Sequence, residues 1–184
     1  MGSSRIDIIN GALSELGEDR LESLTENREA AVVSAERYDR TLADLLSKAP
    51  WRFATKKEAL SRQVTDPVNE WSVSYTLPGT LLRIVRVYPS VRYEVYGGKL
   101  YANTTGLALD YVYTCSESLF PAYFTRLFEY ELAARMALSL TNSATLKQSM
   151  EANARFQFAS ALAADSQQRP NVVIQSSPFT DVRG

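Results

Sequence analysis

Residues 27–53, which read NREAAVVSAERYDRTLADLLSKAPWRF, decide the fold of this chain. Small and apolar side chains recur in this stretch at steps of four, three, four and three residues. The positions concerned are Ala31, Ala35, Tyr38, Leu42 and Leu45. Because steps of three and four residues bring side chains to one side of an α-helix, the spacing predicts an amphipathic helix with one buried stripe.

Local signals mark both ends of this helix. Ser23 with Glu26 fits a capping box, and Asn27 is a second candidate for the N-terminal cap. At the other end, Pro50 disfavours helical backbone at the residue before it, so we expect the helix to end there.

Two aromatic residues, Trp51 and Phe53, follow directly after the expected helix end. A large ring at the point where the chain turns is well placed to pack against the helices around it. We therefore interpret Trp51 and Phe53 as structural anchors.

The composition restricts the classes of function. The chain has 184 residues, enough for one domain or for a domain with an insertion, and 20 basic residues nearly balance 21 acidic ones. A free-standing nucleic-acid-binding protein normally has a basic excess, which is missing here. A single cysteine, Cys115, excludes a disulfide framework and a cysteine-based zinc site.

The complete absence of histidine removes the most common catalytic and metal-binding side chain. The sequence also contains no glycine-rich phosphate-binding motif. Acidic pairs such as Glu15 with Glu18 and Glu129 with Glu131 have the chemistry for acid–base or Mg²⁺ work, but we interpret them as solvated carboxylates on charged helix faces. We predict that the protein is not an enzyme and has no catalytic residue, metal site or cofactor.

No apolar run approaches the length of a membrane span, and the first residues lack the pattern of a signal peptide. We expect a soluble intracellular product.

The rest of the chain predicts further helices on both sides of a β-rich region. A first short helix is expected over residues 4–16, with a capping-box start at Ser4 and Asp7. Residues 122–169 contain neither glycine nor proline and predict two alanine-rich helices with a break near 141–143. Leu138 belongs to the predicted buried stripe of the first of them.

The β-rich region is rich in tyrosine and broken by proline and glycine. Its clearest element is a hairpin over residues 91–103, whose Gly97-Gly98 turn pairs Tyr96 with Lys99. This register places five apolar side chains on one face. They are Val91, Tyr93, Val95, Leu100 and Ala102. Flanking strands are predicted at 71–76, 81–87 and 107–114.

These elements predict a mainly α fold with a β insertion, in the α+β class. Residues 1–50 and 119–168 would form a helical bundle, and residues 51–118 a β-rich insertion with a small antiparallel sheet. Residues 169–184 form an extended C-terminal tail that is too short to fold alone. The tail is either disordered or docked on another chain. Its candidate contact residues are Pro170, Val172, Val173, Ile174, Pro178 and Phe179.

In the order and spacing of several short motifs, the chain resembles the tail tubular protein A family, the head-to-tail adaptors of short-tailed bacteriophages. The motifs lie along nearly the whole chain, at 8–17, 38–46, 50–54, 75–84, 93–103, 120–121 and 163–168. They include Ile8-Ile9-Asn10, Pro50-Trp51-Arg52-Phe53-Ala54, Tyr75-Thr76-Leu77-Pro78, Leu100-Tyr101-Ala102-Asn103 and Ala163-Ala164-Asp165-Ser166-Gln167-Gln168. The chain departs from the family pattern at Gly79-Thr80, where an acidic residue is expected.

The resemblance implies a dodecameric ring between the portal protein and the tail nozzle protein, with double-stranded DNA passing through its lumen without specific binding. It also implies a place in the virion neck, after assembly in the host cytoplasm, and contact with the portal through the C-terminal tail. Two other classes stay open: a different neck or head- or tail-completion protein, and a metal-dependent hydrolase.

Overall fold

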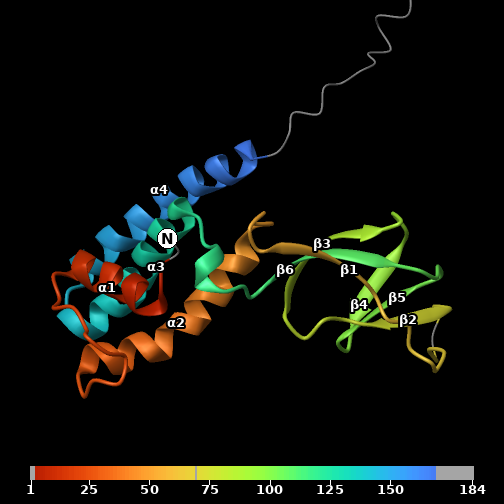
Figure 1. Cartoon of the computed structure of the whole chain (residues 1–184), viewed down its shortest axis with the longest axis horizontal. Helices are drawn as coiled ribbons and strands as arrows, with labels where there is room; N and C mark the ends of the chain where they lie inside the picture. Colours follow the sequence, from red (N-terminus) through yellow and green to blue (C-terminus); the bar gives the residue numbers. More distant parts are fainter. Residues whose placement is uncertain (1–2, 69, 169–184) are drawn as a thin grey trace, which may run out of the picture.

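The computed structural model describes residues 3–68 and 70–168 of the chain, and the structural statements below concern these residues. They form an α+β fold with four α-helices and two three-stranded antiparallel sheets, which confirms the predicted fold class. Figure 1 shows the helices gathered at one end of the molecule and the strands at the other. The elements are α1 (Arg5–Leu16), α2 (Glu29–Lys48), β1 (Thr55–Ala59), β2 (Val73–Thr76), β3 (Leu81–Tyr88), β4 (Tyr93–Tyr96), β5 (Lys99–Ala102), β6 (Ala108–Tyr113), η1 (Glu117–Leu119, a 3₁₀-helix), α3 (Ala122–Thr141) and α4 (Ala144–Gln167).

Helix α1 begins at the capping box that the sequence predicts. The Ser4 side chain accepts a hydrogen bond from the Asp7 N–H, and the Asp7 carboxylate accepts one from the Ser4 N–H at 3.0 Å. The Ser4 hydroxyl also donates to the Asp7 carboxylate, at 2.6 Å, and this bond together with the one from the Ser4 N–H holds the pKa of Asp7 below its ordinary value. Gly17 ends the helix with a positive φ of 75°, a conformation that glycine adopts without a steric penalty.

Helix α2 begins later than either predicted cap. Its N-cap is Arg28, which makes no side-chain capping bond, so the predictions at Ser23 and Asn27 are wrong. The Glu26 carboxylate does accept a hydrogen bond from the Ser23 N–H, at 2.8 Å, but this bond stabilises the loop before the helix. The capping-box signal thus marks a local turn that precedes α2.

The other end of α2 follows the prediction and uses a partner from the β region. Ala49 has extended backbone, as expected before Pro50, and leaves the last carbonyl groups of the helix without intrahelical donors. The Arg83 guanidinium of β3 donates hydrogen bonds to the carbonyl oxygens of Ser47 and Lys48, at 3.2 and 2.9 Å. A cation from the sheet therefore satisfies the negative end of α2.

The buried stripe of α2 differs from the prediction at one position. Ala35 is exposed, and Ser34 is buried in its place. The Ser34 hydroxyl donates to the Ala30 carbonyl oxygen and lies 3.3 Å from the Met136 sulfur of α3. A serine that satisfies its hydroxyl within the helix can be buried at little cost, which a pattern of apolar residues does not reveal.

Helix α3 is the centre of the bundle and packs against α1, α2 and α4. Nine of its residues are buried, with Phe124, Leu127, Phe128 and Leu132 among them. Leu138 is an exception: its side chain is half exposed, whereas the periodicity placed it in the buried stripe. The bundle does not cover the last turns of α3 on that side.

The sheets have the strand orders β1-β6-β3 and β2-β5-β4. The β4–β5 hairpin has the predicted register, with Tyr96 opposite Lys99 and Val95 opposite Leu100. Leu100 and Ala102 are buried, but Tyr93 and Val95 remain partly exposed because β4 lies at the edge of its sheet. Strand β1, with the charged sequence TKKEA, lacks an apolar alternation and was not predicted.

Strand β6 belongs to both hydrophobic cores. Leu109 and Tyr111 pack in the core of the sheets, whereas Val112 packs in the core of the helices. Trp51 and Cys115, which lie within the range predicted as the β-rich insertion, also pack in the helical core. The two cores are therefore joined through residues on either side of the strands.

Within the part of the chain that the structure describes, no helix is both long and apolar enough to cross a membrane.

Candidate functional site

The residues predicted to contact a partner through the C-terminal tail, from Pro170 to Phe179, lie outside the described residues. Their role therefore stays a prediction, and the site has to be sought on the bundle and the sheets.

Trp51 and Phe53 lie in a cluster of aromatic rings. Trp51 is fully buried, and its Nε1–H donates to the Leu45 carbonyl oxygen of α2 at 2.9 Å. Its ring centroid lies 5.2 Å from that of Phe124 and 5.9 Å from that of Phe158. Phe53 is half-buried and lies 4.7 Å from Phe124, also between ring centroids. The two residues connect the end of α2 to both α3 and α4.

Asp165 has a role that the sequence did not reveal. It is buried near the end of α4, and its carboxylate accepts hydrogen bonds from the Arg52 N–H at 3.2 Å and the Tyr123 hydroxyl at 2.8 Å. Burial and this carboxylate raise the pKa of the Tyr123 hydroxyl. The one sequence feature that could have pointed to Asp165 is its place within the motif Ala163–Gln168. Asp165 fixes the end of α4, and with it the point where the tail begins.

The acidic residues interpreted as solvated are instead paired and partly buried, which corrects that interpretation for three of the four. Glu15 and Glu129 both form ion pairs with Arg126, at 2.9 and 3.3 Å, and Glu131 pairs with Lys48. The Glu129 side chain is only 17% exposed. A side chain at Gly11 would require the Glu129 side chain to move away from its present position.

Helix α4 leaves most of its surface outside the core. Only four of its 24 residues are buried, namely Met150, Ala154, Ala161 and Asp165. On the opposite side the exposed residues are uncharged and mostly small, and Phe156 among them is 73% exposed. We call this surface the α4 outer face and define it by Ala152, Phe156, Ala159 and Ala163. These residues extend over about half of a helix that is about 36 Å long.

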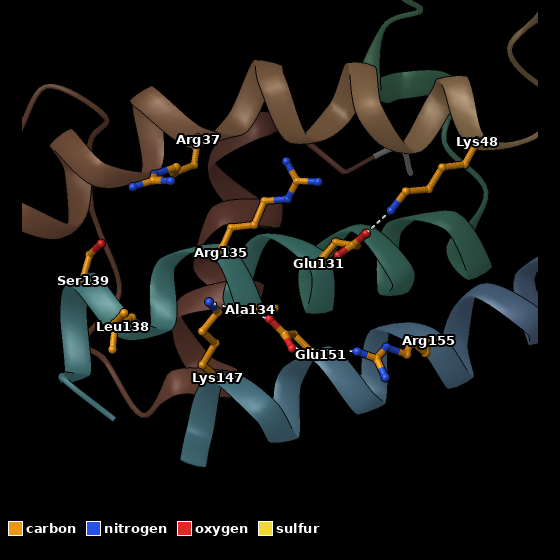
Figure 2. A pocket seen from close by; sticks show the side chains of 10 residues that line it. All are labelled: Arg37, Lys48, Glu131, Ala134, Arg135, Leu138, Ser139, Lys147, Glu151 and Arg155. Carbon is orange, nitrogen blue, oxygen red and sulfur yellow. Dashed lines mark hydrogen bonds and ion pairs between the residues drawn. The ribbon is translucent and has the colours of Figure 1, made fainter. Parts of the chain in front are cut away.

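A cleft of about 570 Å³ lies between α2 and α4, with α3 as its floor. In Figure 2, side chains from all three helices converge on this space, and α1 is seen behind α3. A smaller hollow of about 190 Å³ shares Lys48, Glu131 and Arg155 with the cleft and continues it toward Phe158. We call the two together the basic groove. The sequence did not predict it, because its lining comes from helices far apart in the chain.

The charge of the basic groove is predominantly positive. Its lining includes five basic residues against two acidic ones, Glu131 and Glu151. The basic residues are Arg37, Lys48, Arg135, Lys147 and Arg155. Four ion pairs reduce this charge: Lys48 with Glu131, Lys147 with Glu151, Arg155 with Glu151, and Arg135 with Asp44 at the rim.

Arg37 is the least satisfied of the basic residues in the groove. Its Nε atom is buried and has no hydrogen-bond partner among the described residues. Leu138 and Ala134 add an apolar part to the floor. A ligand with carboxylates beside a few apolar atoms would therefore complement this surface.

No group of three or more His, Cys, Asp or Glu residues that could hold a metal ion is present within residues 3–68 and 70–168. The single cysteine is buried, and burial raises the pKa of the Cys115 thiol to about 11. A thiol with this pKa is almost entirely protonated at neutral pH, so Cys115 is poorly suited to act as a nucleophile.

The sequence was compared with protein-family models and with curated proteins, and neither comparison found a match.

Proposed function

We propose that this chain is a structural head-to-tail adaptor of a short-tailed bacteriophage, of the tail tubular protein A type. It would form a ring between the portal protein and the tail nozzle protein in the neck of the virion, after assembly in the host cytoplasm. Double-stranded DNA would pass through the lumen of the ring.

The α4 outer face is the observation that carries this proposal. A helix face exposed to solvent is normally rich in charged side chains, but the four charged residues of α4 are Lys147, Glu151, Arg155 and Asp165, of which three line the groove and one is buried. The outer face presents alanines around one exposed phenylalanine. Small uncharged side chains allow close approach of another protein, and a central aromatic ring is a typical anchor of such contacts.

The charge balance also supports the proposal. The formal net charge of the chain is −1, so the chain does not attract phosphate groups strongly. A channel through which DNA moves benefits from weak contacts, because each neutralised phosphate would add to the affinity and slow the passage. The motifs shared with the adaptor family are the further support.

The experiment that tests the proposal is the mass of the purified protein with and without the portal protein. We expect a monomer or small oligomer alone, since an interface of small side chains is weak until a template aligns many copies. On the portal we expect twelve copies, measured by native mass spectrometry and by the symmetry of the complex in electron microscopy. A stable ring of another symmetry, or no binding to a portal, would contradict the proposal.

A substitution in the α4 outer face makes this test specific. Phe156→Ser removes the exposed ring without touching the core, so the thermal unfolding midpoint should change by only a few degrees, while assembly on the portal is lost or strongly weakened. Val32→Ser, at an exposed apolar position of α2, is the matched control and should assemble normally. Normal assembly of Phe156→Ser would remove the α4 outer face from the interface.

A further inference from the structure

The basic groove keeps a net positive charge after its ion pairs, and the chain carries a surface of opposite charge elsewhere. The connection between α1 and α2 together with the first residue of α2, residues 18–29, holds five acidic and two basic residues. We call it the acidic loop. Its net charge of −3 faces outward, because Asp19, Glu22 and Glu29 are all exposed.

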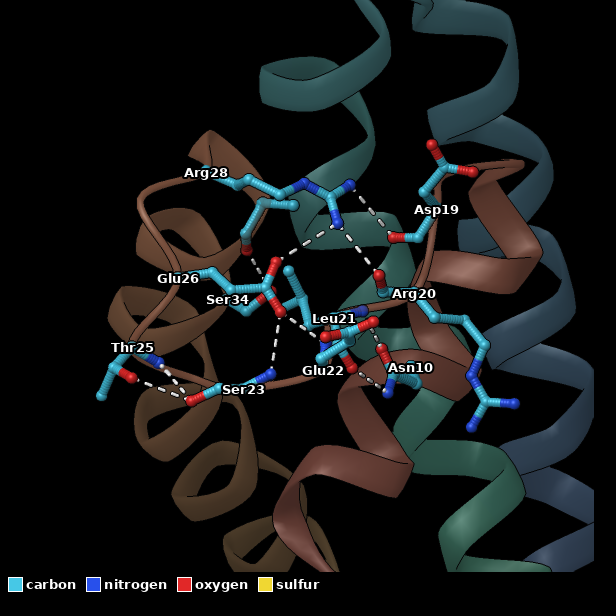
Figure 3. A network of polar contacts seen from close by, with 11 residues as sticks. Asn10, Asp19, Arg20, Leu21, Glu22, Ser23, Thr25, Glu26, Arg28 and Ser34 are labelled. Atoms are coloured by element: carbon cyan, nitrogen blue, oxygen red, sulfur yellow. Dashed lines mark hydrogen bonds and ion pairs between the residues drawn. The ribbon is translucent and has the colours of Figure 1, made fainter.

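Hydrogen bonds within the monomer fix the shape of the acidic loop. The buried Asn10 side chain of α1 accepts from the Leu21 N–H at 2.7 Å and donates to the Leu21 carbonyl oxygen at 3.0 Å. Arg28 donates to the carbonyl oxygens of Asp19 and Arg20. Figure 3 shows this network, with the Asp19 carboxylate directed away from it. A loop held in this way can dock with little loss of conformational entropy.

The acidic loop and the basic groove face different sides of the bundle. In Figure 2 the groove faces the viewer and α1 lies behind α3, whereas in Figure 3 the loop faces the viewer together with α1, and α4 lies behind. Because the loop is tied to α1 through Asn10, it does not reach the groove of its own copy.

We propose that the acidic loop of one copy docks into the basic groove of the next copy. Carboxylates of Asp19 and Glu22 would meet the basic side chains of Arg37, Arg135 and Lys147. Two different surfaces then form one contact, so the contact is head-to-tail and can repeat around a ring. This inference rests on the proposed ring and names the surfaces that close it.

Charge reversal on each side provides a complementation test. One variant carries Arg135→Glu and Lys147→Glu in the groove, and the other carries Asp19→Lys and Glu22→Lys in the loop. Each variant alone brings like charges together, whereas an equimolar mixture restores opposite charges at every contact of an alternating ring. A third variant, Glu94→Lys with Lys99→Glu on the β4–β5 hairpin, also reverses the charge of two residues, but it does so away from the groove and the loop and is the control.

The contact is read by zero-length carbodiimide cross-linking of ¹⁴N- and ¹⁵N-labelled copies, with and without portal, followed by mass spectrometry. We expect cross-links between Lys147 of one label and Asp19 or Glu22 of the other in the wild type. Lys48 with Glu131 should cross-link within one copy in all variants that keep the fold, which controls for the reagent. The mixed-label cross-link should disappear in 1 M salt, which screens charges beyond about 3 Å.

The groove variant has no amine at position 147, and the loop variant has no carboxylate at positions 19 and 22. For the charge-reversed proteins, association on the portal therefore replaces the cross-link as the readout. Loss of association in each variant alone and its recovery in the mixture support the contact. The contact is overturned if the wild type gives no mixed-label cross-link, either with or without the portal protein. It is also overturned if each single variant assembles as well as the wild type. A gel shift of duplex DNA that only the groove variant loses would assign the groove to nucleic acid instead.

These results separate the contact from the proposed function. Normal twelve-fold assembly on the portal by both single variants would overturn the contact and leave the adaptor proposal standing. A salt-sensitive mixed-label cross-link in a protein that does not bind a portal would support the contact and overturn the adaptor proposal.

Discussion

Trp51 joins three helices through one side chain. Its ring packs against Phe124 of α3 and Phe158 of α4, and its Nε1–H bonds to the Leu45 carbonyl oxygen of α2. Burial of this kind combines a large apolar area with a satisfied polar atom, which is the most favourable environment for an indole ring. The sequence indicated the position because Pro50 ends the helix directly before it.

Replacing Trp51 by alanine should destabilise the protein by about 3–5 kcal/mol, since it leaves a cavity in the helical core. Chemical denaturation monitored by circular dichroism measures this loss. Trp51→Phe keeps part of the ring contacts and should lose less. Wild-type stability combined with lost assembly would instead make Trp51 an interface residue.

Glu129 illustrates a carboxyl that folding removes from water. Burial raises its pKa above the value of 4.5 expected without such an environment, although the hydrogen bond from Arg126 acts in the opposite direction. A carboxyl with a higher pKa in the folded chain than in the unfolded chain binds its proton more tightly when folded. Its ionisation therefore opposes folding, and its contribution to the unfolding free energy falls as the pH rises above about 4.5.

Glu129→Gln should remove this pH dependence. We expect the stability of E129Q relative to wild type to rise as the pH increases above about 4.5, because only the wild-type side chain ionises there. Urea denaturation at a series of pH values gives the difference. Glu94→Gln, at an exposed position of β4, is the control for general charge effects. A difference that stays constant with pH would contradict the prediction.

Elements with strong local signals were predicted with their correct type, and the misses have physical causes. The β4–β5 hairpin followed from the Gly97-Gly98 turn, since the turn fixes the register. Strand β1 was missed because its side chains are mostly exposed and its place in the sheet comes from backbone pairing with β6. The start of α2 was misplaced because Glu26 bonds within the loop.

The C-terminal tail can be tested as an element by deleting residues 170–184. If the tail docks on the portal through Val172, Val173 and Ile174, the truncated protein should keep its thermal unfolding midpoint and lose portal binding. Calorimetry and a portal pull-down measure the two properties. A markedly lower midpoint would mean that the tail covers its own bundle. Unchanged portal affinity would equally exclude the docking role.

At the scale of the whole molecule, the fold class could be predicted from the sequence, but the candidate surfaces could not. Periodicity and turns report on single elements, which is why α4 could be predicted as alanine-rich and helical. The basic groove depends on Arg37, Arg135 and Lys147 meeting across three helices, and no local pattern encodes that meeting. The exposure of Leu138 was hidden for the same reason.

Because β6 contributes to both cores, we expect the described part of the chain to unfold in one cooperative transition. Val112→Ala should lower the unfolding free energy by about 2 kcal/mol and shift the helical signal and the near-ultraviolet signal of the tyrosine-rich sheets together. Calorimetric and van't Hoff enthalpies that agree would support this. Two separate transitions would show that the bundle and the sheets unfold independently.

The pairing of β1 with β6 also has a mechanical consequence. The chain leaves the helices through β1 and returns through β6, and these strands are hydrogen-bonded neighbours from Thr55 opposite Val112 to Ala59 opposite Ala108. Together with β3, which pairs with the other side of β6, they form a three-stranded strap that resists bending within its plane and yields more easily across it. Arg83 adds a lateral tie between the strap and the end of α2. The strand end of the molecule should therefore bend more easily across the strap than within its plane. A force across the strap would bend it, whereas a force within its plane would be passed on to the helices.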